Sequence, residues 1–281
     1  MGDRSRVWLI TGVSTGFGRG LAKEVLARGE IVAGTLRQAA QVDEFRALVP
    51  GRSFAYRLDV TDAEAIPQAV ANVVRDTGRI DVLVNNAGYG LIGAAEETSD
   101  AETRKLFETN FFGLLNVTKA VAPHMRAARR GHIVNFSSLA GIMGIPGVSL
   151  YCASKFAVEG LSESLAGELA AFGIKVTIVE PGGFRTDFQG RSIAMPQKVL
   201  PEYAGTPAAN ARVMSAQYDG HQPGDPAKAA KAIVAAVDSD APPLRLVLGA
   251  DALGAGRAKL ASLAQNYDAW ERVSMDTTHA G

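Results

Sequence analysis

Tyr151 and Lys155 are the residues whose types and spacing most directly suggest chemistry in this chain. They lie four positions apart in a segment of helical pattern, so both side chains share one helix face with their Cβ atoms about 5–6 Å apart. A nearby ammonium favours the phenolate form of a tyrosine. Ser138, at the end of the preceding apolar strand, can return to the same point and donate a hydrogen bond. These residues predict an acid/base site, although a Tyr and a Lys also share helices by chance.

A glycine-rich turn near the N-terminus predicts that the chain binds a dinucleotide. The expected strand Val7–Thr11 ends in the sequence GVSTGFG, residues 12–18, and a helical pattern follows. Gly12 allows a tight turn, Gly16 lets the backbone approach a pyrophosphate, and Gly18 lets the helix pack against the strand. The helix N-terminus supplies N–H groups to the anion. A glycine turn without a ligand is the alternative for this segment alone, because its spacing is not the commoner G-x-G-x-x-G.

Arg37 bears on the choice of cofactor. It follows the second expected strand, Glu30–Leu36, where a dinucleotide fold recognises the adenosine ribose. An acidic residue at that place binds the 2′-hydroxyl, whereas an arginine accommodates a 2′-phosphate. We therefore expect NADP(H) rather than NAD(H), with a solvated surface arginine as the alternative.

Strands and helices alternate along the rest of the chain. Further strands are expected at 53–58, 82–84, 133–136, 175–179 and 244–248, with helical patterns between them. This order predicts an α/β fold, a Rossmann-type doubly wound parallel sheet of about seven strands with helices on both faces. Ligands of such sheets bind at the carboxyl ends of the strands. We expect residues 1–281 to form a single dinucleotide-binding and catalytic domain.

Two segments in the second half of the chain depart from simple alternation. Residues 187–225 are punctuated by proline and glycine, so we expect little regular structure there and, from the apolar residues between, a substrate lid. A C-terminal helix is expected at 251–272. Trp8 and Trp270 are interpreted as packing anchors. Asn110 lies within a long helical pattern, where asparagine competes with the backbone for hydrogen bonds.

Taken together, these motifs resemble the short-chain dehydrogenase/reductase family in its compact single-domain branch. The matching motifs stand in the family's order and at its usual separations: Thr11-Gly12-x-x-x-Gly16-x-Gly18, Asn85-Asn86-Ala87-Gly88, Ser138, Tyr151-x-x-x-Lys155 and Pro181-Gly182. The resemblance implies an oxidoreductase that transfers a hydride between a nicotinamide cofactor and a small-molecule carbonyl or secondary alcohol. The apolar lid favours a hydrophobic substrate.

The resemblance also implies roles for the catalytic residues. Tyr151 is expected to exchange a proton with the substrate oxygen and Ser138 to hold that oxygen. Lys155 is expected to bind the nicotinamide ribose and to lower the pKa of Tyr151. Asn110 is expected to hold a water that links Lys155 to solvent.

The resemblance places further residues along the cofactor. Asp59 and Val60 are expected beside the adenine, Asn86 along the nicotinamide side of the cleft, and Thr186 at the carboxamide. The residues expected to contact the cofactor are Gly12, Ser14, Thr15, Gly16, Phe17, Gly18, Arg37, Asp59, Val60, Asn86, Ala87, Gly88, Tyr151, Lys155, Pro181, Gly182 and Thr186.

Composition narrows the remaining possibilities. The formal net charge is +0 at pH 7, so we expect no nucleic-acid partner and no attraction to an anionic membrane. The single cysteine, Cys152, and four histidines without ligand spacing predict no metal site, and Cys152 itself is interpreted as a small core residue. No segment approaches 18 consecutive apolar residues, and we expect a cytoplasmic protein without a membrane partner.

Alternatives to the oxidoreductase come from two other classes. A catalytically silent protein that senses the cofactor would have lost the Tyr or the Lys, and both are present. An epimerase or dehydratase would carry a different glycine spacing and a longer substrate domain. We further expect a homodimer or homotetramer, because the apolar last strand should lie at a sheet edge that needs cover.

Overall fold

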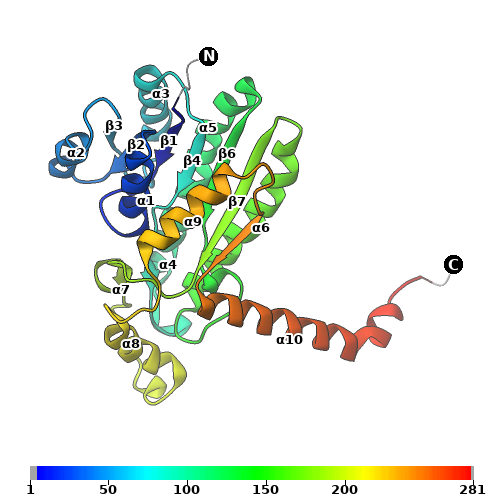
Figure 1. The fold of residues 1–281 in the computed structure, drawn as a ribbon. Coiled ribbons are helices and arrows are strands. Elements are labelled where there is room, and N and C mark those ends of the chain that lie inside the picture. Colours follow the sequence, from blue (N-terminus) through cyan, green and yellow to red (C-terminus); the bar gives the residue numbers. More distant parts are fainter. Residues whose placement is uncertain (1–4, 280–281) are drawn as a thin grey trace.

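Seven short strands pair in parallel in one central sheet of the computed structural model, which describes residues 5–279. The spatial order is β3-β2-β1-β4-β6-β7-β9, so the chain builds outward from β1 first to one side and then to the other (Figure 1). The predicted doubly wound α/β fold in a single domain is confirmed, and the strand bounds lie within two residues of those expected. They are β1 (Val7–Ile10), β2 (Ile31–Leu36), β3 (Ser53–Arg57), β4 (Val82–Asn85), β6 (Gly131–Phe136), β7 (Ile174–Pro181) and β9 (Arg245–Leu248).

Helices cover both faces of the sheet. The principal ones are α1 (Gly16–Ala27), α2 (Ala39–Arg46), α3 (Ala65–Thr77), α4 (Asp100–Phe107), α5 (Leu114–Ala128), α6 (Ser149–Ala170), α9 (Pro226–Asp238) and α10 (Ala250–Met275). In β1, Trp8 and Ile10 pack in one apolar cluster with residues of α1 and α9, whereas Leu9 packs in a second cluster with residues of α3 and α5. Successive strand side chains point to opposite faces, which explains why these strands are apolar throughout instead of alternating.

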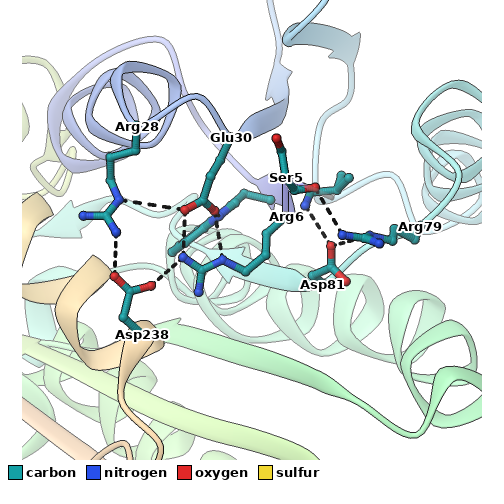
Figure 2. Close-up of polar contacts among 9 residues, drawn as sticks. Ser5, Arg6, Arg28, Glu30, Arg79, Asp81 and Asp238 are labelled. Carbon is teal, nitrogen blue, oxygen red and sulfur yellow. Dashed lines mark hydrogen bonds and ion pairs between the residues drawn. The ribbon is translucent and has the colours of Figure 1, made fainter. Parts of the chain in front are cut away.

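A network of ion pairs fastens the amino ends of the first two strands to the end of α9 (Figure 2). Arg6, just before β1, pairs with Glu30 before β2 at 2.7 Å and also contacts Asp238, the last residue of α9. Arg28 reaches the same Asp238 carboxylate at 2.7 Å. The network lies at the opposite edge of the sheet from the strand ends that carry the predicted site. We therefore assign it to the fold and not to the chemistry.

The 187–225 segment contains more regular structure than expected. It holds α7 (Phe188–Arg191), the short strand β8 (Ile193–Ala194), a 3-10 turn at Pro201–Tyr203 and the helix α8 (Pro207–Tyr218). The expectation of little regular structure is therefore wrong for α8. Thr206 caps this helix by accepting a hydrogen bond from the Ala209 N–H, and Pro207 occupies its first turn. Proline is favoured there because that position needs no N–H donor, so the residue read as a breaker begins a helix.

The 187–225 segment is held against the body of the domain by a strand pairing and by hydrogen bonds to Glu96, Glu97 and Glu102. Strand β8 pairs in parallel with β5 (Gly90–Leu91), a second small sheet that the sequence did not predict. The buried carboxylate of Glu97 accepts a hydrogen bond from the Leu200 N–H at 3.0 Å and forms an ion pair with Arg212 of α8. The segment therefore lies against residues 90–97 instead of hanging free.

Helix α10 begins on the body and then runs out from it (Figure 1). It ends at Met275, three residues beyond the expected bound. Trp8 is fully buried and confirms its interpretation as a packing anchor, whereas Trp270 is 58% exposed, so that interpretation is wrong for Trp270 within one chain. No helix within residues 5–279 has the length and apolar character needed to cross a lipid bilayer.

Candidate active site

Tyr151 and Ser138 are brought together by two neighbouring elements. Strand β6 ends at Phe136, and Ser138 caps the short turn that follows by accepting a hydrogen bond from the Ala140 N–H at 3.1 Å. Helix α6 starts at Ser149 and places Tyr151 in its first turn. The Ser138 hydroxyl lies near enough to the Tyr151 phenol to act on it, in the direction that lowers its pKa. The meeting point expected from the sequence is therefore present, and Tyr151 is buried there.

Lys155 lies one helical turn below Tyr151 and is also buried. Its ammonium donates a hydrogen bond to the Phe136 carbonyl at 2.8 Å, which ties α6 to the end of β6. The Lys155 nitrogen lies 5.8 Å from the centre of the Tyr151 ring. The two side chains thus share one face of the helix, as their four-residue spacing predicts.

Burial, and not the attraction between the two side chains, is the largest cause of the pKa shifts of Tyr151 and Lys155. It raises the pKa of Tyr151 to about 12, with the Ser138 hydroxyl acting in the opposite direction. It lowers the pKa of Lys155 to about 8, opposed by the carboxylate of Glu159. The expected lowering of the Tyr151 pKa is therefore not seen, because removal of both groups from water favours their neutral forms.

Asn110 lies where the expected long helix is interrupted. Between α4 and α5, residues Glu108–Gly113 form a π-helical turn, and such turns are frequent at functional sites. The Asn110 side-chain amide bonds to the main chain at Tyr89. It accepts a hydrogen bond from the Tyr89 N–H at 3.0 Å and donates one to the Tyr89 carbonyl at 2.9 Å. It also donates to Ser154 of α6 at 3.2 Å. The asparagine that is unfavourable in an α-helix thus joins three elements beside Lys155.

Gly88 allows the Asn110 and Lys155 side chains to come close to the main chain. A Cβ at Gly88 would lie 3.1 Å from the Asn110 oxygen and 3.8 Å from the Lys155 nitrogen. Ala87, next to Gly88, packs against the apolar cluster that Leu9 forms with residues of α3 and α5. The Asn-Asn-Ala-Gly motif therefore lines the same space as the Tyr–Lys pair.

The glycine turn has the form that an anion-binding cradle requires. Gly12 and Gly16 adopt φ angles of 73° and 58°, a region that disfavours other residues. A Cβ at Gly18 would lie 2.3 Å from the Gly12 carbonyl oxygen, so only glycine fits there. Thr15 occupies the N-cap of α1 without a side-chain cap bond, and Ser14 before it is exposed. The first N–H groups of α1 therefore remain available to a phosphate.

Asn86 holds this turn in place. Its amide nitrogen donates to the carbonyls of Thr11 and Gly12 at 2.9 and 3.0 Å. The resemblance placed this side chain along the nicotinamide side of the cleft. In the structure its amide binds the main chain of the glycine turn, so Asn86 supports that turn, and its contact with the cofactor stays a prediction.

Thr186 and the Pro181-Gly182 turn approach the glycine cradle from the end of β7. A Cβ at Gly16 would lie 3.6 Å from the Cβ of Thr186. Phe17 packs at 5.2 Å from Phe184 and at 5.4 Å from Phe136, measured between ring centres. The ends of β1, β6 and β7 therefore lie close together, at the edge of the sheet where ligands of doubly wound folds bind.

Asp251 is a positioning residue that the sequence did not reveal. It lies in the first turn of α10, and its carboxylate accepts a hydrogen bond from the Gly183 N–H at 2.7 Å. A Cβ at Gly182 would lie 2.3 Å from the same carboxylate. The two glycines of the Pro-Gly-Gly sequence were the available sign of this contact, because only residues without a side chain let the Asp251 carboxylate come so close.

The expected adenosine end lies at the carboxyl ends of β2 and β3. Arg37 is exposed, and its carbonyl accepts a hydrogen bond from the Arg57 side chain at 3.3 Å. Asp59 is exposed and caps its own loop by accepting from the Thr61 N–H at 3.0 Å, whereas Val60 is buried. Two guanidinium groups therefore stand at neighbouring strand ends, where sequence analysis had noted only one.

An apolar cluster surrounds Tyr151. A cluster of buried residues combines Leu91, Leu106, Ala140, Tyr151 and Cys152, and Phe188 and Ala194 of the 187–225 segment pack against it. The rings of Tyr151 and Phe188 have their centres 5.9 Å apart. The segment expected to be a lid thus contacts the catalytic candidate directly, and Cys152 has the core position predicted for it.

These features define an α/β enzyme of the dinucleotide-binding kind, with an uncapped glycine cradle and a Tyr, a Lys and a Ser at the carboxyl edge of its sheet. The family model of short chain dehydrogenases matches residues 6–197. The chain belongs to the short-chain dehydrogenase/reductase family, whose members are oxidoreductases that act on CH–OH groups with a nicotinamide cofactor.

Named relatives cover most of the chain. It is 37% identical to Oxidoreductase BOA17 of Botryotinia fuckeliana over 272 residues, which is 96% of this chain and 98% of the relative. It is 37% identical to human retinol dehydrogenase 8 over 263 residues, 87% of this chain and 82% of the relative. It is also 47% identical over 184 residues to a 3-ketodihydrosphingosine reductase of Bacteroides thetaiotaomicron, 65% of each chain.

Solved structures agree with the fold. A short-chain dehydrogenase from Streptomyces avermitilis is 44% identical and superposes with a TM-score of 0.91 over 99% of this chain and 100% of its own. ElxO with NADP bound is 29% identical, with a TM-score of 0.71 over 87% and 96%. A Burkholderia phymatum enzyme in complex with NAD, 23% identical, shares the fold with a TM-score of 0.81 over 95% and 97%. Members of this fold thus bind either nicotinamide cofactor.

Proposed function

We propose that this protein interconverts a hydrophobic carbonyl compound and its secondary alcohol, with NADP(H) preferred and with Tyr151 as the acid/base. The observation that carries the proposal is the meeting of Tyr151, Ser138 and Lys155 at the end of β6, with the Tyr151 ring in an apolar cluster.

The residues divide the work as follows. The nicotinamide, when bound, supplies or accepts the hydride. Tyr151 gives its phenolic proton to the carbonyl oxygen in reduction and takes it back in oxidation, while Ser138 holds that oxygen by a hydrogen bond. Lys155 holds the cofactor ribose, and its charge favours the phenolate once Tyr151 has given up its proton. Asn110 holds a water beside Lys155, which supplies the proton that replaces the one transferred.

The proposed preference for NADP(H) is supported by Arg37, with Arg57 beside it. Both lie at strand ends that flank the expected adenosine ribose. The end of β2, where an acidic residue would bind a 2′-hydroxyl, carries Arg37. A guanidinium can bind a 2′-phosphate through two parallel hydrogen bonds.

The hydrophobic substrate is supported by the apolar cluster around Tyr151. Half-buried Phe188 offers apolar contact beside the Tyr151 ring, and the 187–225 segment would act as a lid that excludes water during the reaction. Two relatives are named for retinol and for 3-ketodihydrosphingosine, both largely hydrocarbon molecules. We therefore infer a long-chain or polyene ketone or alcohol as the substrate class.

The alternative of a catalytically silent cofactor sensor is not favoured, because the Tyr, Lys and Ser are all present and meet. We also propose a homodimer or homotetramer, supported by the position of β9 at the edge of the sheet. A cytoplasmic location is proposed from the single, unpaired cysteine, which suits a reducing compartment.

The test is a panel of hydrophobic, sugar and small keto-acid substrates, followed by nicotinamide absorbance with NADPH and NADH in parallel. On the best substrate, Tyr151→Phe should lower turnover by about 10²–10⁴-fold, the usual contribution of general acid–base catalysis, while NADPH still binds. A variant that keeps more than about a tenth of the rate would remove Tyr151 from the mechanism. Activity on polar substrates alone would instead overturn the substrate class.

A further inference from the structure

Helix α10 runs away from the body (Figure 1). Along its outer part a stripe of apolar side chains is exposed. Its first turns are covered, since Ala252 is fully buried and Gly256 packs near Ile142. Beyond them, Leu260, Tyr267 and Trp270 are 66%, 70% and 58% exposed, and Leu263 is half-buried. Large exposed apolar residues at regular spacing mark an interaction surface. We call Leu260, Leu263, Tyr267 and Trp270 the α10 stripe.

The α10 stripe has the spacing of a coiled-coil seam. Leu260 and Tyr267 are seven residues apart, as are Leu263 and Trp270, and the two pairs are offset by three. These are the a and d positions of two successive heptads, the pattern by which two helices pack knobs into holes. The seam continues from the face that the body covers at Gly256, so a partner helix can follow directly where the body ends.

The charges beside the α10 stripe match a second copy of α10 in the antiparallel direction. In that direction Leu260 faces Trp270 of the other copy, and Leu263 faces its Tyr267. The flanking e positions then place Arg257 beside Glu271 of the other copy, twice by symmetry. Neither residue forms an ion pair within residues 5–279. A parallel pair would match no opposite charges at these positions, and it would bring both bodies to the same end.

The area available suits a small, reversible contact. A fully buried Trp or Tyr contributes about 150–250 Å², and with Trp270 58% and Tyr267 70% exposed, two of each can still bury on the order of 400–650 Å². The four leucines of the paired stripes add to this, which places the contact among weak associations that bury less than about 1,200 Å² in total. The whole helix has 26 residues and is therefore about 39 Å long, enough for both heptads to overlap.

We propose that two copies of this chain associate through an antiparallel coiled coil of their α10 helices, with the α10 stripes as the seam. This surface is distinct from the β9 edge that supports the homo-oligomer proposed above. A failure of the α10 contact therefore leaves that proposal, and the proposed catalysis, open to their own tests.

The first experiment measures the mass of the full chain by light scattering and sedimentation across the micromolar range. A dimer is expected, and Trp270→Lys should weaken its association by more than about tenfold, as loss of a central aromatic usually does. Met275→Lys is the matched control, since Met275 is 64% exposed but lies off the seam. A monomeric wild type, or a dimer that Trp270→Lys leaves intact, would overturn the proposal.

A cross-linking experiment tests the direction and register of the pair. Ala264 and Gln265 both lie at the centre of the overlap, Ala264 beside the seam and Gln265 on the outer face. Ala264→Cys should join two chains with a short bismaleimide, whereas Gln265→Cys should not. Cys152 is buried and gives a low background. Equal cross-linking at both positions would rule out this register.

Charge reversal separates the coiled coil from a lipid surface. Glu271→Arg should weaken the dimer by about 1.5- to 5-fold for each of the two ion pairs, and Arg257→Glu in the same chain should restore it. A monomer that instead binds phosphatidylcholine vesicles through Trp270 would show that lipid occupies the stripe, and the proposal would fall.

Discussion

At the residue scale, burial shifts the pKa values of Tyr151 and Lys155 in opposite directions. Burial raises the pKa of the phenol to about 12 and lowers that of the ammonium to about 8. At neutral pH the tyrosine therefore keeps the proton that reduction of a carbonyl requires. The lysine keeps its charge only below about pH 8, so we expect reduction to lose efficiency above that pH as the ribose contact and the favourable charge are lost.

Replacement of Lys155 and of Ser138 should have different effects. Lys155→Ala should lower both turnover and NADPH affinity, because the ammonium binds the ribose, and should remove the loss of reduction above about pH 8 that titration of Lys155 causes. Ser138→Ala should lower turnover with little change in NADPH affinity and should keep that loss, since Lys155 is still present. Titration of NADPH and the pH dependence of kcat for each variant test this, and identical profiles would contradict the assignment.

Arg37 should decide the cofactor preference. Arg37→Ala should weaken NADPH binding by roughly ten- to a hundredfold, the worth of charge-assisted hydrogen bonds of about 1.5–3 kcal/mol, and should leave NADH binding unchanged. Arg57→Ala is the informative companion, because it removes the second guanidinium while leaving Arg37 in place. Equal affinity of the wild type for both cofactors would contradict the preference.

At the scale of elements, a buried carboxyl pair joins α6, β7 and β9. Glu159 of α6 and Glu180 of β7 are both buried, and the Arg245 guanidinium of β9 lies 3.5 and 3.4 Å from them. Their four oxygens lack a well-aligned hydrogen-bond partner within the described part of the chain. Burial and the neighbouring carboxylate raise the pKa of Glu180 from 4.5 to about 7. Glu159 lies one turn beyond Lys155, so this pair also supports the catalytic helix.

The pair predicts a pH dependence of stability with a definite sign. Because the folded pKa of Glu180 is raised, the stability it contributes is complete below about pH 4.5 and is lost as the pH rises through about 7. Glu180→Gln should remove that loss, so the variant should gain on the wild type by on the order of 1–3 kcal/mol between pH 5 and 8. Denaturant unfolding at several pH values measures this.

Glu163→Gln is the matched control for the carboxyl pair. Glu163 contacts the same Arg245 at 2.7 Å, but its side chain is 61% exposed. This variant should leave the pH dependence of unfolding as it is in the wild type. A Glu180→Gln variant with the wild-type slope would show that the pair does not titrate in this range.

At the scale of the whole molecule, the candidate active site is built from segments that are distant in the sequence. The glycine turn follows β1, the Asn-Asn-Ala-Gly motif follows β4, Ser138 follows β6, and Thr186 follows β7. The close approach of these loops requires glycine, as at Gly18, where a Cβ would lie 2.5 Å from the Asn86 amide. A ligand that bridges these segments should therefore stabilise the fold as a unit.

Thermal unfolding with NADPH tests this coupling. At one hundred times its Kd, NADPH should add about 2.7 kcal/mol to the free energy of unfolding and raise Tm by several degrees. Gly18→Ala should lower Tm and remove most of the NADPH shift, because the cradle must distort. Gly20→Ala in the same helix should retain it, since its Cβ would meet only the Pro226 carbonyl at 3.8 Å. Equal NADPH shifts in both variants would contradict the cradle.

Local sequence patterns were enough to predict the fold and the two main motifs of the candidate site. The order of apolar strands and helices predicted the doubly wound sheet, because a strand buried on both faces is apolar at every position. The glycine turn and the Tyr–Lys spacing predicted the two halves of the candidate site, since each depends on residues close together in the sequence.

Contacts between distant segments could be decided only by the tertiary structure. Asp251 accepts a hydrogen bond from the Gly183 N–H, although the two residues are 68 positions apart in the sequence. The Glu159–Glu180 pair likewise forms only when α6 packs on β7. The raised pKa of Tyr151 depends on the apolar cluster that buries it, and the residues of that cluster come from several segments of the chain. Trp270 was read as a packing anchor because it is large and apolar, but α10 leaves the body before reaching it. Residue types and spacing thus determined which groups could act, whereas packing decided their surroundings, because burial and charge depend on neighbours brought in from elsewhere in the chain.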